Sequence, residues 1–364
     1  MRTFTCTCGN RLFFENHRCM ACGRDTGFVP EIGELVAIEG SDAAGWRALH
    51  PRLAGRHFRR CSNYAHQGVC NWMVPDDEDH AFCQACRLNQ VIPDLTRPRH
   101  RLYWARIEAA KRRLIYELNV LELPVFSRMA DPEKGLGFAF MADAAPVQEF
   151  SDPLEGNSRV LTGHNQGLVT INIAEADDIA RENMRQSMGE RYRSLLGHFR
   201  HEIGHYYWLL LISDAPALLD AFRECFGDER ADYQQALDAY YANGPLTDWP
   251  RHFISAYASS HPWEDWAETF SHYLHMTDTL EAAVQLRFSA VDLSDRSLGN
   301  FDAWLSAWVE LTTGLNELNR CMGHSDLYPF VLSPSARAKL FCVHELVTVN
   351  AARPLRELGV VTHA

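Results

Sequence analysis

Residues 198–208 read HFRHEIGHYYW and contain an H-E-x-x-H pattern from which the rest of the chain can be interpreted. The wider segment 181–212 has a helical pattern, so His201 and His205 lie one turn apart on the same helix face. Two imidazoles placed in this way can bind one metal ion, and Glu202 projects beside them, where it can act as a general base. The pattern predicts a catalytic metal site with two of its protein ligands on this helix.

A second motif lies farther along the chain, where residues 255–276 read SAYASSHPWEDWAETFSHYLHM. Its aromatic and aliphatic residues recur at helical spacing, and Glu264 and Glu268 share one face of the predicted helix. A catalytic zinc ion needs three protein ligands and one open position, so a carboxylate on this second helix would complete the site. A further carboxylate one turn away can hydrogen-bond the other ring nitrogen of a ligand histidine.

Together the two motifs resemble the gluzincin metallopeptidases, a group that includes thermolysin and anthrax lethal factor. The resemblance implies that Glu264 is the third zinc ligand and that Glu268 supports a ligand histidine. It also implies a catalytic role for Tyr257, whose hydroxyl would donate to the oxyanion of a tetrahedral intermediate. The alternative for Tyr257 is a half-buried aromatic residue in a serine-rich loop. The metzincin pattern is absent, because Trp208 and Leu211 stand where that pattern requires glycine and histidine.

Eight of the 11 cysteines lie before residue 87 and form two sets of four. Each set ends in a C-x-x-C pair, which can direct two thiolates at one tetrahedral ion from a tight turn. Because four thiolates leave no open position, both sets predict structural zinc sites, with disulfides or free thiols as the alternative. The first site would comprise Cys6, Cys8, Cys19 and Cys22, and the second would comprise Cys61, Cys70, Cys83 and Cys86.

The cysteine sets, the two motifs and the segment LYPFVLS at 327–333 are similar to a bacterial family of zinc-binding metallopeptidases with an N-terminal zinc-ribbon domain. The similarity extends over nearly the whole chain. It implies the fold and the metal sites, but it implies no particular substrate.

The chain has 364 residues, of which 46% are hydrophobic, and is long enough for two domains. We predict an α+β fold with a mostly helical, zincin-like metallopeptidase domain at 116–364. A small double zinc-ribbon module at 1–96 and a basic linker helix at 97–115 would precede it.

Short strands are expected within the second domain at 120–126, 137–141 and 167–173, with helices dominating from residue 178 onward. In zincin-like folds a strand such as 167–173 pairs with an extended peptide substrate when it has a free edge. The alternative is an interior strand with no free edge.

Charge is unevenly distributed, since residues 1–113 carry 17 Lys and Arg against 12 Asp and Glu in a chain of net charge −12. The basic residues of the linker helix could form a phosphate-binding stripe, or they could be a solvated helix face. They are Arg97, Arg99, Arg101, Lys111, Arg112 and Arg113.

Several histidines near the two motifs also need an interpretation. Each can be an ordinary hydrogen-bonded imidazole. His272, one turn beyond Glu268, could support the site or replace Glu264 as a ligand if Glu264 points away. The others are His198, His261 and His275.

The sequence therefore predicts a zinc-dependent peptidase with one catalytic and two structural zinc ions, acting on a peptide or protein substrate. A second hypothesis is a regulator whose ribbons bind nucleic acid or a protein partner and whose zincin domain is inactive or sensory. A third is a hydrolase of non-peptide amides. The N-terminus lacks the apolar stretch of a signal peptide, and no apolar run could span a membrane, so we expect a cytoplasmic protein without a membrane partner.

Overall fold

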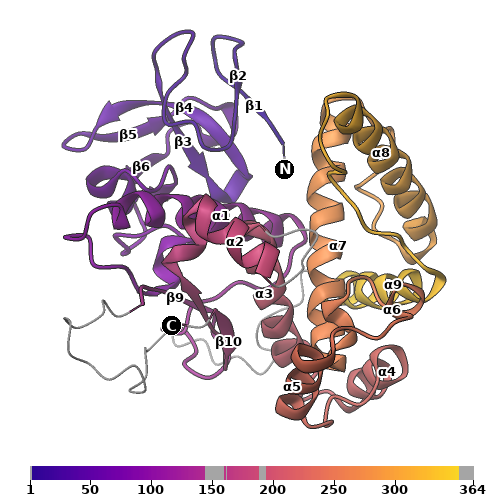
Figure 1. The fold of residues 1–364 in the computed structure, drawn as a ribbon. Helices are drawn as coiled ribbons and strands as arrows, with labels where there is room; N and C mark the ends of the chain where they lie inside the picture. Colours follow the sequence, from indigo (N-terminus) through magenta and orange to yellow (C-terminus); the bar gives the residue numbers. More distant parts are fainter. Residues whose placement is uncertain (1, 144–159, 161, 188–193, 352–364) are drawn as a thin grey trace, which may run out of the picture. The chain divides into compact units, whose positions relative to one another are not determined.

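A computed structural model describes residues 2–143, 160, 162–187 and 194–351 (Figure 1). The chain divides into two compact units. The N-terminal unit combines Thr3–Tyr116 with Val125–Gly189, and the helical unit combines Met1–Arg2 and Glu117–Pro124 with Glu190–Ala364. All strands of the described residues belong to the N-terminal unit, so the fold is α+β, as predicted.

The N-terminal unit begins with two antiparallel sheets, and the eight cysteines lie in the turns, loops and a short 3-10 helix next to their strands. The cores of these sheets are aromatic: Phe28 packs on Trp72 with ring centroids 4.6 Å apart, and Phe14 and Tyr116 complete the cluster. The small sheet pairs β1 (Phe4–Thr5) with β2 (Arg11–Leu12). The larger sheet has the order β3 (Asp25–Val29), β4 (Glu34–Ser41), β5 (Gly45–Ala48), β6 (His57–Arg60) and β7 (Met73–Pro75).

A four-stranded mixed sheet also belongs to this unit, and α2 (Asp178–Ser187) follows it in the chain. Its order is β10 (Gly163–Asn165), β11 (Leu168–Asn172), β9 (Gly137–Met141) and β8 (Asn89–Val91). The predicted strand at 137–141 is therefore confirmed. The free edge suggested for 167–173 is wrong, because β11 is antiparallel to β10 on one side and parallel to β9 on the other.

The linker helix is α1 (His100–Val120), and two of its basic residues are not at the surface. Lys111 is fully buried and forms an ion pair with Glu108 at 2.9 Å, while buried Arg112 donates to the carbonyl of Val69. Neither a phosphate-binding stripe nor a solvated face describes these two residues. The sequence pattern suggested that both side chains face solvent. Instead their aliphatic stems are buried, and their charged ends contact protein groups in place of water.

Two other local predictions differ from the structure. The apolar segment 120–126 is not a strand, because α1 runs to Val120 and a turn follows in which Glu122 has a φ of 56°. The helical pattern at 181–212 is divided between α2 and α3 (Leu195–Leu211). Ser194 begins α3, since its hydroxyl accepts a hydrogen bond from the Gly197 backbone at 3.0 Å.

The helical unit is organised around the pairing of α3 with the long helix α7. Both helices have histidines, glutamates and aromatic residues among their buried side chains. Helix α7 spans Pro262–Gln285. The other described α-helices that lie wholly in this unit are α4 (Pro216–Phe226), α5 (Tyr233–Asn243), α6 (Trp249–His252), α8 (Phe301–Cys321) and α9 (Pro334–Asn350). Among the described helices, none combines the length and apolar character that crossing a membrane requires.

Candidate metal centre

The two motifs meet because α3 and α7 approach each other closely at Gly204. A Cβ atom added to Gly204 would lie 3.0 Å from Ala267 Cα and 3.2 Å from the Ala267 carbonyl oxygen, so a larger residue would push the helices apart. The Trp266 indole donates to the Gly204 carbonyl at 2.8 Å and fixes the contact. The small residue inside the H-E-x-x-H pattern is therefore what lets the second helix reach the histidines.

Three ligand-type atoms converge at this contact. His201 Nε2 lies 3.0 Å from Glu264 Oε2 and 3.2 Å from His205 Nε2, and His205 Nε2 lies 3.5 Å from Glu264 Oε2. A tetrahedral zinc ion with ligand distances of about 2.0–2.1 Å separates its ligand atoms by about 3.3–3.4 Å. The spacing of the three atoms thus fits one zinc ion.

The charges at this cluster favour a cation. Glu264 is only 1% exposed, and in the described part of the chain its Oε2 atom has no hydrogen-bond partner. Burial acts to raise the pKa of Glu264, but the two adjacent histidines outweigh it and hold this pKa well below the ordinary value. Burial acts to lower the pKa of His201, but Glu264 and Glu268 outweigh it and raise this pKa well above the ordinary value.

Glu268 contacts the other ring nitrogen of His201. Its Oε1 atom lies 2.7 Å from His201 Nδ1, and its Oε2 atom accepts a hydrogen bond from the Ser255 hydroxyl at 2.5 Å. The pair fixes the orientation of the imidazole and directs Nε2 at the cluster. Ser255 was missed at the sequence level, because its position before α7 gives no periodic signal.

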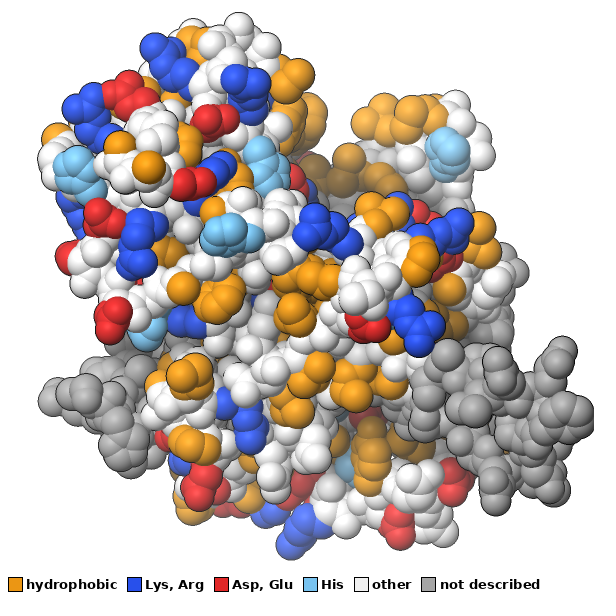
Figure 2. Space-filling view, turned by 90° about the vertical axis from the view of Figure 1, so that its left-hand side faces the viewer, with side chains coloured by type: hydrophobic (Ala, Val, Ile, Leu, Met, Phe, Trp, Pro, Cys, Tyr) orange, Lys and Arg blue, Asp and Glu red, His pale blue; other side chains and the backbone are white. Residues whose placement is uncertain are grey.

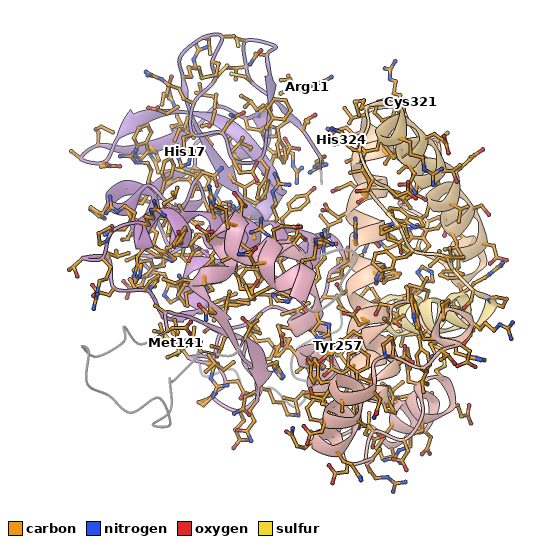
Figure 3. The ribbon with its side chains drawn as sticks, viewed as in Figure 1. Arg11, His17, Met141, Tyr257, Cys321 and His324 are labelled. Atoms are coloured by element: carbon orange, nitrogen blue, oxygen red, sulfur yellow. A yellow bond between two sulfur atoms is a disulfide. The ribbon has the colours of Figure 1, made fainter. Side chains whose placement is uncertain are left out.

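Glu202 and Tyr257 lie near the cluster on different elements. Glu202 is 7% exposed on α3. The pKa of Tyr233, whose hydroxyl contacts Glu264, is raised mainly by burial and by Glu264, with a smaller contribution from the charge of Glu202. Tyr257 begins a short 3-10 helix (Tyr257–Ser259) near α5, and its ring centroid lies 5.9 Å from that of His201 (Figure 3).

Three other histidines near the motifs make hydrogen-bond or packing contacts outside the cluster. His272 is 2.8 Å from the Tyr328 hydroxyl through Nδ1, and burial lowers its pKa to about 4. Because Glu264 points at the two α3 histidines, His272 is not needed as a substitute ligand. His261 begins α7, where its Nδ1 accepts from the Trp263 backbone, and His275 packs against Trp308.

The eight N-terminal cysteines form two separate clusters of four thiols. The Sγ atoms of Cys6 and Cys22, of Cys8 and Cys19, and of Cys70 and Cys83 are each 3.7 Å apart. A tetrahedral zinc ion with Zn–S distances of about 2.3 Å separates its sulfur atoms by about 3.8 Å, whereas a disulfide holds them at about 2.0 Å. The clusters therefore support zinc binding, and the disulfide alternative fails.

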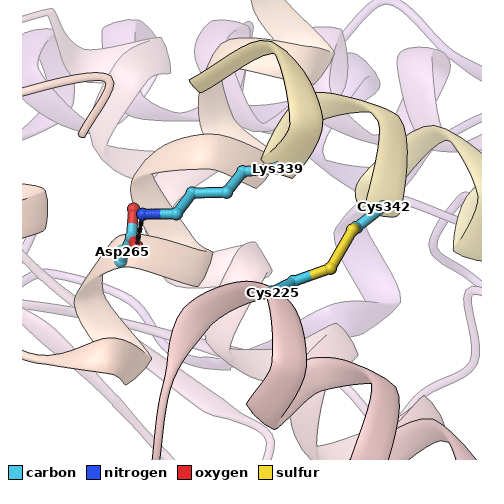
Figure 4. Close-up of a disulfide and its surroundings, with 4 residues drawn as sticks. All are labelled: Cys225, Asp265, Lys339 and Cys342. Atoms are coloured by element: carbon cyan, nitrogen blue, oxygen red, sulfur yellow. Dashed lines mark hydrogen bonds and ion pairs between the residues drawn. A yellow bond between two sulfur atoms is a disulfide. The ribbon is translucent and has the colours of Figure 1, made fainter. Parts of the chain in front are cut away.

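Two contacts made by α9 were also missed at the sequence level (Figure 4). The buried Asp265 carboxylate pairs with Lys339 of α9 at 2.5 Å, directly after the candidate ligand. Cys225 of α4 forms a disulfide with Cys342 of α9. These residues lie far apart in the sequence, so spacing alone could not have revealed either contact.

Comparison with known families places the chain among zinc-binding proteins. The profile of a family described as "Putative zinc-binding metallo-peptidase" matches residues 100–346, which contain the whole α3–α7 cluster. The chain belongs to this family. A zinc-ribbon domain profile matches residues 3–97 of the same chain, where both cysteine clusters lie.

Relatives of this family member occur in mycobacteria. Proteins of Mycobacterium bovis and of two strains of Mycobacterium tuberculosis, each described as an uncharacterized protein, are 42% identical over 352 residues. The match covers 95% of this chain and 95% of each relative. No solved structure matches the chain significantly.

Proposed function

We propose that the protein is a zinc-dependent peptidase whose catalytic ion is held by His201 Nε2, His205 Nε2 and Glu264 Oε2. The observation that carries the proposal is the convergence of these three atoms at mutual distances of 3.0, 3.2 and 3.5 Å. Two histidines and one carboxylate leave the fourth position of a tetrahedral ion open, which is the feature that separates catalytic from structural zinc sites.

The chemistry divides between the ion and the protein. A bound zinc ion supplies Lewis acidity, which lowers the pKa of a water molecule to about 7 and polarises a carbonyl group. Glu202 accepts the proton of the attacking water as the new C–O bond forms. It then gives that proton to the departing amine nitrogen as the C–N bond breaks. Glu264 and Glu268 are each committed to the histidines, so proton transfer is assigned to Glu202.

Tyr257 is proposed to donate a hydrogen bond to the oxygen on which negative charge develops. Burial raises the pKa of its hydroxyl above the ordinary value, so the group keeps its proton at neutral pH. Its ring lies beside His201, on the same cluster that would hold the ion. A neutral phenol is the form that can serve as a donor.

The regulator hypothesis loses part of its sequence support. Lys111 and Arg112 are buried, and Arg113 pairs with Glu15. Arginines of the larger sheet also pair with acidic residues, as in the contact of Arg59 with Asp76. Figure 2 shows one face of the molecule, on which Lys and Arg side chains are interspersed with Asp and Glu. A nucleic-acid or protein partner of the ribbons stays a prediction.

Reversible metal removal tests the proposed activity. The zinc-loaded protein is expected to cleave unfolded casein, and 1,10-phenanthroline should abolish cleavage because it takes zinc from the site with an open position. Added zinc should restore the activity, whereas 1,7-phenanthroline, which does not chelate, should have no effect. Cleavage that persists in the chelator, or a zinc-loaded protein that cleaves nothing, would contradict the proposal.

A further inference from the structure

Tyr233 reaches the buried carboxylate of Glu264 from an exposed helix. It is the first residue of α5, a helix that buries none of its residues fully and whose N-cap is Asp232. Tyr233 itself is 37% exposed, yet its hydroxyl donates to Glu264 Oε1 at 2.6 Å, and Glu264 is 1% exposed. In Figure 1, α5 lies beside the end of α7 where that helix begins.

The two oxygens of Glu264 have different neighbours. Oε1 accepts the Tyr233 hydrogen bond, while Oε2 lies 3.0 Å from His201 Nε2 and 3.5 Å from His205 Nε2. A carboxylate oxygen that accepts a hydrogen bond from a fixed hydroxyl is a weaker metal ligand and is held towards that hydroxyl, which favours ligation through the other oxygen alone. Single-oxygen ligation matters because a second bond from Glu264 would occupy the position that a catalytic ion keeps open.

The tyrosine is held in place by the start of α7. His261 Nδ1 accepts a hydrogen bond from the Trp263 backbone at 3.1 Å, so Nε2 carries the proton and donates to the Ala231 carbonyl at 3.1 Å. Through these two hydrogen bonds, His261 connects the turn before α5 to the start of α7, the helix that carries Glu264. The Tyr233 ring packs edge-on against His261 and Trp263, and Trp263 packs on His205 with centroids 4.0 Å apart.

We propose that Tyr233 is a positioning residue that holds Glu264 as a single-oxygen ligand of the catalytic zinc ion. The inference rests on the proposed function, since it assumes an ion at the His201, His205 and Glu264 cluster. Tyr233 acts through Glu264 and needs no contact with a substrate. No motif marks it, because it lies on a different helix from every other member of the cluster.

Tyr233→Phe removes the hydroxyl and keeps the ring that packs against His261 and Trp263. Loss of such a supporting hydrogen bond typically lowers metal affinity about 10–100-fold. In the full-length protein, the third zinc ion should leave at a chelator concentration about 10–100-fold lower than in the wild type. The zinc ions of the two cysteine clusters should stay bound. Tyr103→Phe is the matched control, because it removes a hydroxyl that also donates to a carboxylate, that of Asp177 at 2.6 Å, within the N-terminal unit.

A cobalt spectrum distinguishes positioning from a purely structural role. Cobalt placed at the third site of the wild type should give the intense visible absorption of a four-coordinate ion. Tyr233→Phe should weaken that absorption, since Glu264 is then able to ligate through both oxygens and raise the coordination number. The thermal midpoint of the protein with this site empty should fall only slightly in the variant, by the loss of one hydrogen bond to a buried carboxylate, and this small fall cannot account for a loss of metal affinity of about 10–100-fold.

The outcomes separate the two proposals. A wild type that binds no third metal ion would overturn the proposed function and this inference with it. A third ion that Tyr233→Phe binds with wild-type affinity and an unchanged cobalt spectrum would overturn the role of Tyr233 alone. A variant that only lowers the thermal midpoint of the protein with an empty site would likewise leave Tyr233 a structural residue.

Discussion

Glu202→Gln is expected to lower the rate of peptide hydrolysis by about 10²–10⁴-fold, the range that a general base contributes. The amide matches the carboxylate in size but cannot accept the proton of the attacking water. Glu202 is 7% exposed and lies between the two histidines on α3, so an equal-sized replacement should preserve the packing. The variant should still bind three zinc ions, because Glu202 is not among the converging ligand atoms.

Glu345→Gln is the matched control, since it makes the same chemical change at an exposed position of α9. Casein cleavage and zinc content are measured on the same preparations of both variants and the wild type. Near wild-type cleavage by Glu202→Gln would remove the general-base assignment. Loss of the third zinc ion in this variant would instead make Glu202 part of the metal-binding group.

Cys83→Ser is expected to remove one zinc ion and to destabilise the N-terminal unit severely. All four thiols of this cluster are buried, and zinc bound by such sites contributes apparent free energies of about 10–16 kcal/mol in small zinc domains. Charged side chains also lie next to these four thiols. Arg112 is buried near these thiols, and Glu108 Oε2 lies 3.9 Å from Cys86 Sγ.

Zinc per chain and the thermal midpoint measure this effect, with Cys321→Ser as the control. Cys321 is exposed and makes no disulfide, so its replacement should change neither quantity. A Cys83→Ser protein that retains its zinc content and its thermal midpoint would show that this cluster is not a structural zinc site.

Local spacing in the sequence was sufficient to predict which residues come together where a single helix turn or tight turn determines their geometry. His201 and His205 share a face because they are four residues apart, and a C-x-x-C pair places two thiols together for a similar reason. Spacing alone could not choose between Glu264 and Glu268, so the assignment needed the resemblance to gluzincins. The structure then brings Glu264 to both histidines and Glu268 to the far side of His201.

Contacts between distant segments could not be predicted from the sequence. Tyr233 reaches Glu264 from another helix, and Lys339 reaches Asp265 from the end of the chain, so neither pair follows a period. Lys111 was misread because charged residues on a helix usually face solvent, whereas here Glu108 and the Asn89 side chain compensate for its burial. Such pairings depend on tertiary packing that no local pattern encodes.

Counting zinc ions per chain tests the central claim most directly. The wild type is expected to contain three, one for each of the three clusters, and a His201→Ala/His205→Ala variant is expected to contain two and to be inactive. The variant removes two of the three proposed ligands of one site and leaves both cysteine clusters intact. Two zinc ions in both proteins would contradict the catalytic site, and the α3–α7 cluster would then have to be explained without a metal.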